Sequence, residues 1–251
     1  MDFCNRQAVS DVIEGKRVAI IGSGPGVLAN EPGYIDSHQV VVRVNNYKTS
    51  LPAGFRTDVF YSFFGRSVRK TAEELNGDGV SLCLAKCPDA HCIDSEWHIR
   101  NGKMRGVDFR EIYKERKGWW FCPTYVPSVD EFMRNFEILG GRVPTTGFSA
   151  ILDVLSYKPA SVYLSGFDFF QSKIHNVNEP WNRMNPNDPI GHVPDGEKTW
   201  LAANMSRYPI TVDTQLALAL KGLVKPDQSV RRAAQIAQYR KMAALRRKVR
   251  A

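Results

Sequence analysis

The sequence lacks any apolar run that approaches the roughly 18 residues a bilayer-spanning helix needs. Its first ten residues lack the basic start and apolar stretch of a secretory signal. The biases of collagen-like and disordered chains are missing too, since 43% of the residues are hydrophobic and 24% are charged. These absences exclude membrane-spanning, fibrous and disordered classes, and they predict a cytoplasmic globular protein.

Cysteine is scarce and odd in number, with five in the chain. Cys83, Cys87 and Cys92 follow a C-x3-C-x4-C spacing with two histidines nearby, but the paired C-x2-C spacing of most structural zinc sites is missing. We therefore expect reduced thiols and no metal site. Cys83 lies inside an apolar run and is expected in the core.

The net charge of +8 is confined to the end of the chain. Residues 225–251 carry nine Lys and Arg side chains against the single acid Asp227, while the rest of the chain is balanced. We therefore predict a domain over residues 1–224 and a basic, helix-prone tail over 225–251. The tail has no clean apolar face; a solvated tail and nucleic-acid binding are alternatives, and we favour peripheral contact with an anionic membrane surface.

Short β-branched runs alternate with helical patterns. The predicted strands cover residues 17–21, 40–44, 57–63, 80–85 and 161–164, and the predicted helices cover 67–75, 128–139 and 148–156. This alternation predicts a parallel sheet with crossover helices, hence a single α/β Rossmann-like domain. A polar loop over residues 171–191 has the length and composition of a lid, with a passive surface loop as the alternative.

A glycine loop, Gly22-Ser-Gly-Pro-Gly26, follows the first predicted strand, where a parallel sheet presents a ligand crevice. A dinucleotide fingerprint would need glycine at position 27, which is Val27, and an acid at the end of the second strand, where Asn45 and Asn46 stand. The loop therefore predicts a nucleotide site that is not an NAD or FAD site. Asn45 is a candidate for binding a base or ribose, although one of the two asparagines is expected to form a turn.

Five motifs extend this pattern through the chain. They are VAIIGSGPG from Val18, VRVN from Val42, PTTGF from Pro144, VYLSGFDFF from Val162, and IGH ending at His192. In this order they resemble the motifs of bacterial sialyltransferases of glycosyltransferase family 42, over roughly residues 16–220. A weaker similarity, which includes a His192-x4-Glu197 pair, leads to the animal-type sialyltransferases. Ser23 and Phe170 depart from the family's usual asparagine and frequent tyrosine.

The resemblance implies a metal-independent, inverting glycosyltransferase. It would move sialic acid, or as second choice Kdo, from a CMP conjugate to a hydroxyl of a surface glycan or glycolipid such as a lipooligosaccharide. His192 would be the general base and Tyr163 would donate to the phosphate, with Trp181 in the acceptor site. The implied donor-binding residues are Gly22, Ser23, Gly24, Pro25, Asn45, Thr145, Thr146, Gly147, Gly166 and Asp168. No cofactor is implied besides the CMP-sugar donor.

The chemistry of these residues agrees with that reading. An acceptor hydroxyl loses its proton as it attacks, and histidine titrates close to working pH, so His192 suits the role of base. Thr145, Thr146 and Gly147 precede a predicted helix, whose N-terminal N–H groups stabilise anions, although a threonine there can also be only an N-cap. The competing hypothesis is a nucleic-acid-associated protein with an inactive α/β body and a basic tail.

Overall fold

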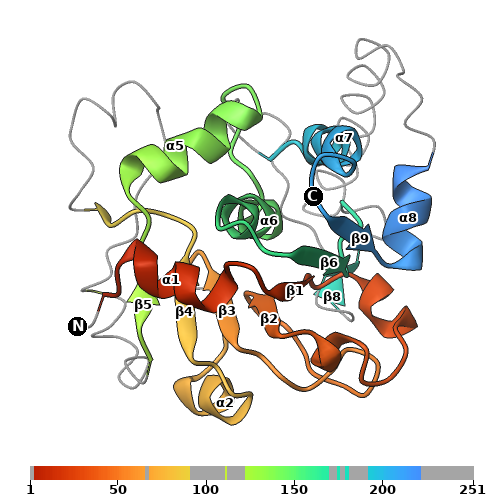
Figure 1. Ribbon diagram of the computed structural model, residues 1–251, viewed down its shortest axis with the longest axis horizontal. Helices are drawn as coiled ribbons and strands as arrows, with labels where there is room; N and C mark the ends of the chain where they lie inside the picture. Colours follow the sequence, from red (N-terminus) through yellow and green to blue (C-terminus); the bar gives the residue numbers. More distant parts are fainter. Residues whose placement is uncertain are drawn as a thin grey trace, which may run out of the picture.

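The computed structural model describes residues 3–65, 68–90, 111, 122–169, 174–175, 179–180 and 192–221. Its central sheet has the strand order β5-β4-β3-β2-β1-β6-β9, with every neighbouring pair parallel (Figure 1). The strands are β1 (Arg17–Ile21), β2 (Val40–Val44), β3 (Val59–Ser62), β4 (Leu82–Ala85), β5 (Thr124–Tyr125), β6 (Ser161–Ser165) and β9 (Ile210–Val212). This confirms the predicted α/β Rossmann-like class.

The chain builds the sheet outward from β1 in both directions. It proceeds from β1 through β2 to β5 on one side, then returns to place β6 and β9 on the other. The strand order therefore reverses between β1 and β6. In open α/β sheets, ligands bind outside the carboxyl ends of the strands at such a reversal. The glycine loop at residues 22–26 follows β1 at this point.

Six helices lie within the described ranges, and most begin at a side-chain cap. They are α1 (Arg6–Ile13), α2 (Ala72–Gly77), α5 (Val129–Ile138), α6 (Thr146–Ser156), α7 (Pro194–Asn204) and α8 (Thr214–Leu220). Asn5, Thr71, Ser128, Thr145 and Asp213 each accept a hydrogen bond from a backbone N–H of the first turn. Two short 3-10 segments occupy Pro25–Ala29 and Ile35–Ser37.

Alternate residues of β2 face the two sides of the sheet. Val42 belongs to the large core that includes α6, whereas Val41 belongs to a smaller core with the 3-10 segments. Figure 1 shows α6 over the middle of the sheet, with α5 and α7 on either side of it. Arg43 is fully buried beside Val41 and donates to the carbonyl oxygens of Ala53 and Arg56. Within the described ranges, the face opposite α6 is covered by short elements, which include both 3-10 segments and α2.

The predicted elements hold with a few corrections. The strands at 17–21 and 40–44 are found at those bounds, whereas the third and fourth are shorter than predicted. The helix predicted from residue 67 is wrong at its start, because Thr71 and Glu74 form a capping box that begins α2 at Ala72. Cys83 is buried in β4 as predicted.

Several predictions fall outside the described residues. These include most of the lid loop at 171–191, Trp181 and the tail at 225–251; only the antiparallel pair β7 (Ile174–His175) and β8 (Glu179–Pro180) is described within the loop. Across the described ranges, no helix combines the length and apolar character needed to cross a bilayer. Among the same residues, no three His, Cys, Asp or Glu side chains gather in a way that would hold a metal ion.

Candidate active site at the carboxyl edge of the sheet

The glycine loop packs directly on the backbone that follows β6. The N–H of Gly22 donates to the carbonyl oxygen of Ser165, and the N–H of Gly24 donates to that of Gly166, both at 2.8 Å. A Cβ on Gly22 would lie 2.4 Å from the Gly166 oxygen, and one on Gly24 would lie 2.8 Å from it. Gly166 itself has φ +75°. These glycines are therefore required for close backbone approach, whatever ligand the loop binds.

Asp213 ties this junction to α8. Its Oδ2 accepts hydrogen bonds from the Ser165 hydroxyl and the Gly166 N–H, each at 2.8 Å, and its Oδ1 caps α8 at Leu216. Only 5% of Asp213 is exposed. Sequence reasoning missed this residue, although an aspartate before the apolar run of α8 is a recognisable N-cap signal.

The ring of Phe167 brings the start of α6 next to the glycine loop. A Cβ on Gly22 would lie 3.3 Å from the Cε1 atom of Phe167, and one on Gly147 would lie 2.8 Å from the same atom. Asp168 follows, with its carboxyl carbon 3.4 Å from the position of a Cβ on Gly24. The structure therefore gathers three predicted donor-binding segments, 22–26, 145–147 and 166–168, at one edge of the sheet.

Three side chains hold the turn at residues 143–145 that precedes α6. Nδ1 of His192 lies 2.8 Å from the carbonyl oxygen of Val143, and Nζ of Lys86 donates to that of Pro144 at 2.7 Å. Glu197 accepts hydrogen bonds from both the N–H and the hydroxyl of Thr145, the latter at 2.8 Å. The start of α6 is thus fixed by the end of β4 and by the segment 192–197.

Lys86 and Glu197 are buried ionisable groups. Glu197 is 1% exposed, and burial raises its pKa to about 7, while the bonds from Thr145 and the charge of Lys86 act the other way. Burial likewise lowers the pKa of Lys86. Sequence reasoning did not assign a role to either side chain. Lys86 stands in no motif, and Glu197 lies in a polar stretch that carries no sign of burial.

The contact with Val143 fixes the tautomer of His192. A carbonyl oxygen only accepts hydrogen bonds, so Nδ1 carries the proton and Nε2 carries the lone pair of the neutral ring. His192 is exposed, in contrast to Glu197. An exposed imidazole that is oriented through Nδ1 is suited to accept a proton at Nε2.

The remaining candidates occupy different positions. Asn45 directly follows β2, has φ +50° and accepts a hydrogen bond from the Ser62 hydroxyl at 3.1 Å. Asn46 accepts a hydrogen bond from the Arg69 N–H. Ser23 lies in the glycine loop, and Pro25 begins the first 3-10 segment.

Tyr163 is not brought to the His192 cluster. It points to the face of the sheet opposite α6, stacks on His38 with ring centroids 5.5 Å apart, and donates its hydroxyl proton to Asn30. Burial raises the pKa of Tyr163 to about 12. In this structure its hydroxyl therefore faces Asn30 and not a phosphate position near α6.

Comparison with known proteins supports the fold. No protein-family model matches the chain, and no curated protein sequence matches it. The structure of the sialyltransferase CstII from Campylobacter jejuni with the substrate analogue cytidine-5'-monophosphate is similar, with TM-score 0.51 and 16% identity over 79% of this chain and 80% of that one. The monofunctional α-2,3-sialyltransferase Cst-I from the same organism gives TM-score 0.49 and 15% identity over 84% of this chain and 77% of that one. A mammalian sialyltransferase gives TM-score 0.47 and 20% identity over 81% of this chain and 71% of that one.

The likeness to CstII shows a shared fold and nothing finer at this identity. It confirms the α/β fold that the resemblance to family 42 implies.

Proposed function

We propose that this protein is a CMP-sugar-dependent, inverting glycosyltransferase that transfers sialic acid, or alternatively Kdo, to a glycan or glycolipid acceptor. The observation that carries the proposal is the position of His192. Its Nδ1 bond to Val143 orients the ring beside the turn that begins α6. That turn adjoins the glycine loop through Phe167. A candidate base and a candidate phosphate site therefore share one edge of the sheet, at the reversal of strand order.

The start of α6 is the proposed site for the donor's phosphate or carboxylate. The N–H groups of Thr146 and Gly147 have no acceptor within the helix, and the helix dipole places partial positive charge there. Thr145 caps the same first turn, since its hydroxyl oxygen accepts from the Phe148 N–H at 3.1 Å. Asn45 and the loop residues Gly22, Ser23, Gly24 and Pro25, with Gly166 and Asp168 beside them, are proposed to line the nucleotide side.

The proposed reaction is a single displacement at the anomeric carbon. The acceptor oxygen forms a bond to that carbon, the bond to the CMP phosphate breaks, and the configuration inverts. Nε2 of His192 takes the proton that the acceptor hydroxyl loses. Negative charge builds on the departing phosphate, where N–H groups of α6 stabilise it. We propose that hydroxyl and N–H donors perform this role without a metal ion.

The acceptor contact through Trp181 and the membrane contact through residues 225–251 remain predictions from the sequence. The donor is tested by incubating the full chain with CMP-sialic acid or CMP-Kdo, with and without EDTA, and measuring CMP release. We expect one donor to be cleaved at a rate that EDTA does not change. If neither donor is bound or cleaved, the proposal is wrong; if EDTA abolishes release, its metal-free part is wrong.

A further inference from the structure

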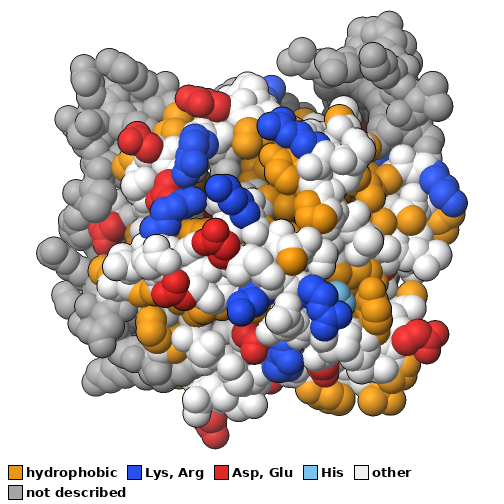
Figure 2. Space-filling model, viewed as in Figure 1, with side chains coloured by type: hydrophobic (Ala, Val, Ile, Leu, Met, Phe, Trp, Pro, Cys, Tyr) orange, Lys and Arg blue, Asp and Glu red, His pale blue; other side chains and the backbone are white. Residues whose placement is uncertain are grey.

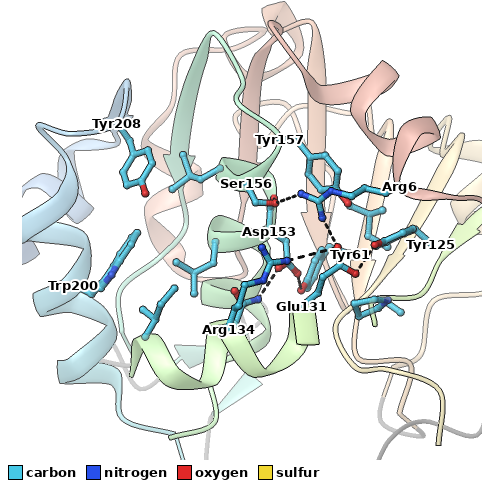
Figure 3. A pocket seen from close by; sticks show the side chains of 17 residues that line it. Arg6, Tyr61, Tyr125, Glu131, Arg134, Asp153, Ser156, Tyr157, Trp200 and Tyr208 are labelled. Carbon is cyan, nitrogen blue, oxygen red and sulfur yellow. Dashed lines mark hydrogen bonds and ion pairs between the residues drawn. The ribbon is translucent and has the colours of Figure 1, made fainter. Parts of the chain in front are cut away.

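A hollow lies on the face covered by α5, α6 and α7, and it has a volume of about 180 Å³. Figure 2 shows this face, where Lys and Arg side chains over α1 and α5 are interspersed with Asp and Glu and lie next to exposed hydrophobic atoms. Its walls come from α1, α5, the second half of α6 and the α7–β9 region (Figure 3). We call it the α5–α6 groove, and it includes Arg134, Asn135, Ile138, Asp153, Leu155 and Trp200.

The groove is separate from the candidate active site. Thr146 begins α6 at the carboxyl edge of the sheet, whereas Asp153 lies seven residues further along the same helix. At a rise of 1.5 Å per residue, this separation is about 10 Å along the helix axis. None of the predicted donor-binding residues lines the groove. A ligand there would therefore occupy a site of its own.

At the charged end of the groove, the guanidinium of Arg134 keeps N–H donors for a ligand. Glu131 is engaged by Arg6, by the Tyr125 hydroxyl at 2.6 Å and by the N–H of its N-cap residue Ser128. Arg134 forms an ion pair with Glu131 at 3.7 Å, a separation beyond hydrogen-bonding distance, and its side chain is 57% exposed. Among the described residues, none accepts a hydrogen bond from the Arg134 guanidinium. Arg134 is therefore placed to bind a carboxylate through two parallel N–H donors.

The floor of the groove is polar. Asp153 accepts hydrogen bonds from the Tyr61 hydroxyl and from Nδ2 of Asn135, the latter at 2.6 Å. Burial raises the pKa of Asp153 to about 6. Ser156 lies one turn further along α6, with its hydroxyl bonded to the Asp153 carbonyl oxygen at 2.7 Å. These groups pair with one another, and the exposed Ser156 hydroxyl offers a polar contact that a sugar hydroxyl can use and a hydrocarbon cannot.

The other end of the groove is aromatic and aliphatic. The rings of Trp200 and Tyr208 stack with centroids 6.1 Å apart, and Figure 3 shows both across the groove from Arg134. Leu155 lines the space between, and Ile138 is 42% exposed at its edge. Within the described ranges, no side chain hydrogen bonds to the Tyr208 hydroxyl or the Trp200 indole N–H. This end offers apolar surface together with polar tips, as aromatic side chains do at ligand sites.

We propose that the α5–α6 groove binds an acidic saccharide. The carboxylate pairs with Arg134, the ring hydroxyls bond to Asn135, Ser156 and the aromatic tips, and the C–H face of the ring lies against Trp200 and Leu155. Drug-sized ligands occupy roughly 300–1,000 Å³, so the smaller volume of this groove suits about one sugar ring. This binding does not depend on the proposed transferase activity.

The test is saturation-transfer NMR on the full chain, titrated with free N-acetylneuraminic acid. Neutral N-acetylglucosamine and hexanoate are the comparison probes. We expect saturable transfer to the acidic sugar and much weaker transfer to both others. Equal transfer to the neutral sugar would contradict a role for the carboxylate, and stronger transfer to hexanoate would show an apolar-acid site. Either result, or no transfer to the acidic sugar, overturns the proposal.

Two exposed substitutions locate the binding. Arg134→Gln should weaken binding of the acidic sugar about tenfold or more, because a charge-assisted pair is lost. Ile138→Glu should weaken it similarly by placing a carboxylate at the edge of the groove. Arg17→Gln changes an exposed arginine outside the groove and is the matched control. His192→Ala should leave this binding unchanged; if instead it abolishes binding while Arg134→Gln does not, the sugar occupies the candidate active site and the proposal is wrong.

Discussion

The carboxylate of Glu197 accepts hydrogen bonds from both the backbone N–H and the hydroxyl of Thr145. This pair joins the first turn of α7 to the start of α6. His192 reaches the same turn through Val143, so the segment 192–197 holds the turn at both of its ends. The orientation of the candidate base and the position of the candidate phosphate site are therefore set by one set of contacts.

Removing the Glu197 carboxylate should destabilise the fold. We expect Glu197→Ala to lower the free energy of unfolding by about 2–4 kcal/mol, because it leaves a cavity and an unpaired N–H at Thr145. Glu197→Gln keeps the shape and one acceptor oxygen, so its loss should stay below about 1 kcal/mol. Urea unfolding of both variants at pH 5, where the wild-type carboxyl is protonated, measures the difference. Equal losses would show that the hydrogen bonds from Thr145 contribute nothing.

The same carboxyl should make stability depend on pH. Burial raises the pKa of Glu197 from 4.5 to about 7, so the folded protein holds this proton more tightly than the unfolded chain. The stabilising contribution is full below pH 4.5 and is lost as the pH rises toward 7. Wild type should therefore lose stability relative to Glu197→Gln between pH 5 and 8 in urea titrations. A gap that stays constant over this range would contradict the pKa shift.

The glycine loop should not tolerate a methyl group. Gly22→Ala places a Cβ 2.4 Å from the Gly166 oxygen, so we expect a loss of about 1–3 kcal/mol in unfolding free energy or failure to fold. Gly77→Ala is the control, because a Cβ at this last residue of α2 meets nothing within 4 Å. It should leave the melting temperature unchanged or raise it slightly. Equal melting temperatures for the two variants would show that the loop relaxes away from Gly166.

Variants at two helix caps distinguish an effect on stability from an effect on activity. Thr145 caps α6 at the candidate site and Thr71 caps α2 away from it, each accepting an N–H hydrogen bond at 3.1 Å. Replacing Thr71 by valine should cost about 1–2 kcal/mol of stability, and replacing Thr145 should cost more, because its hydroxyl also donates to the buried Glu197 carboxylate. Only Thr145→Val should also slow CMP release from the donor, because α6 is the proposed phosphate site. Thermal melts and CMP-release assays on both variants test this, and equal activity in the two would argue against the α6 site.

The sequence predicts the centre of the sheet better than its edges. β1 and β2 are buried on both faces, so their β-branched runs are continuous and their bounds are clear. β5 and β9 have two and three residues, too few for a pattern. Glu197 and Thr145 lie 52 residues apart in the chain, and no local signal links them.

The side of the sheet on which Tyr163 lies could be predicted from the sequence. Its neighbours Val162 and Leu164 pack in the core with α6, and strand alternation then places Tyr163 on the other side. A motif match assigns this residue to a site but does not show where its side chain points. The hydroxyl reaches Asn30, whose position depends on the 3-10 segment after the glycine loop.

The central claim is that His192 takes the acceptor's proton. The most direct test is the rate of CMP release from the cleaved donor, with a saccharide acceptor present, for wild type and His192→Ala. We predict a fall of about a hundredfold or more in the variant, with CMP binding by calorimetry unchanged. A variant that releases CMP at the wild-type rate would contradict the account.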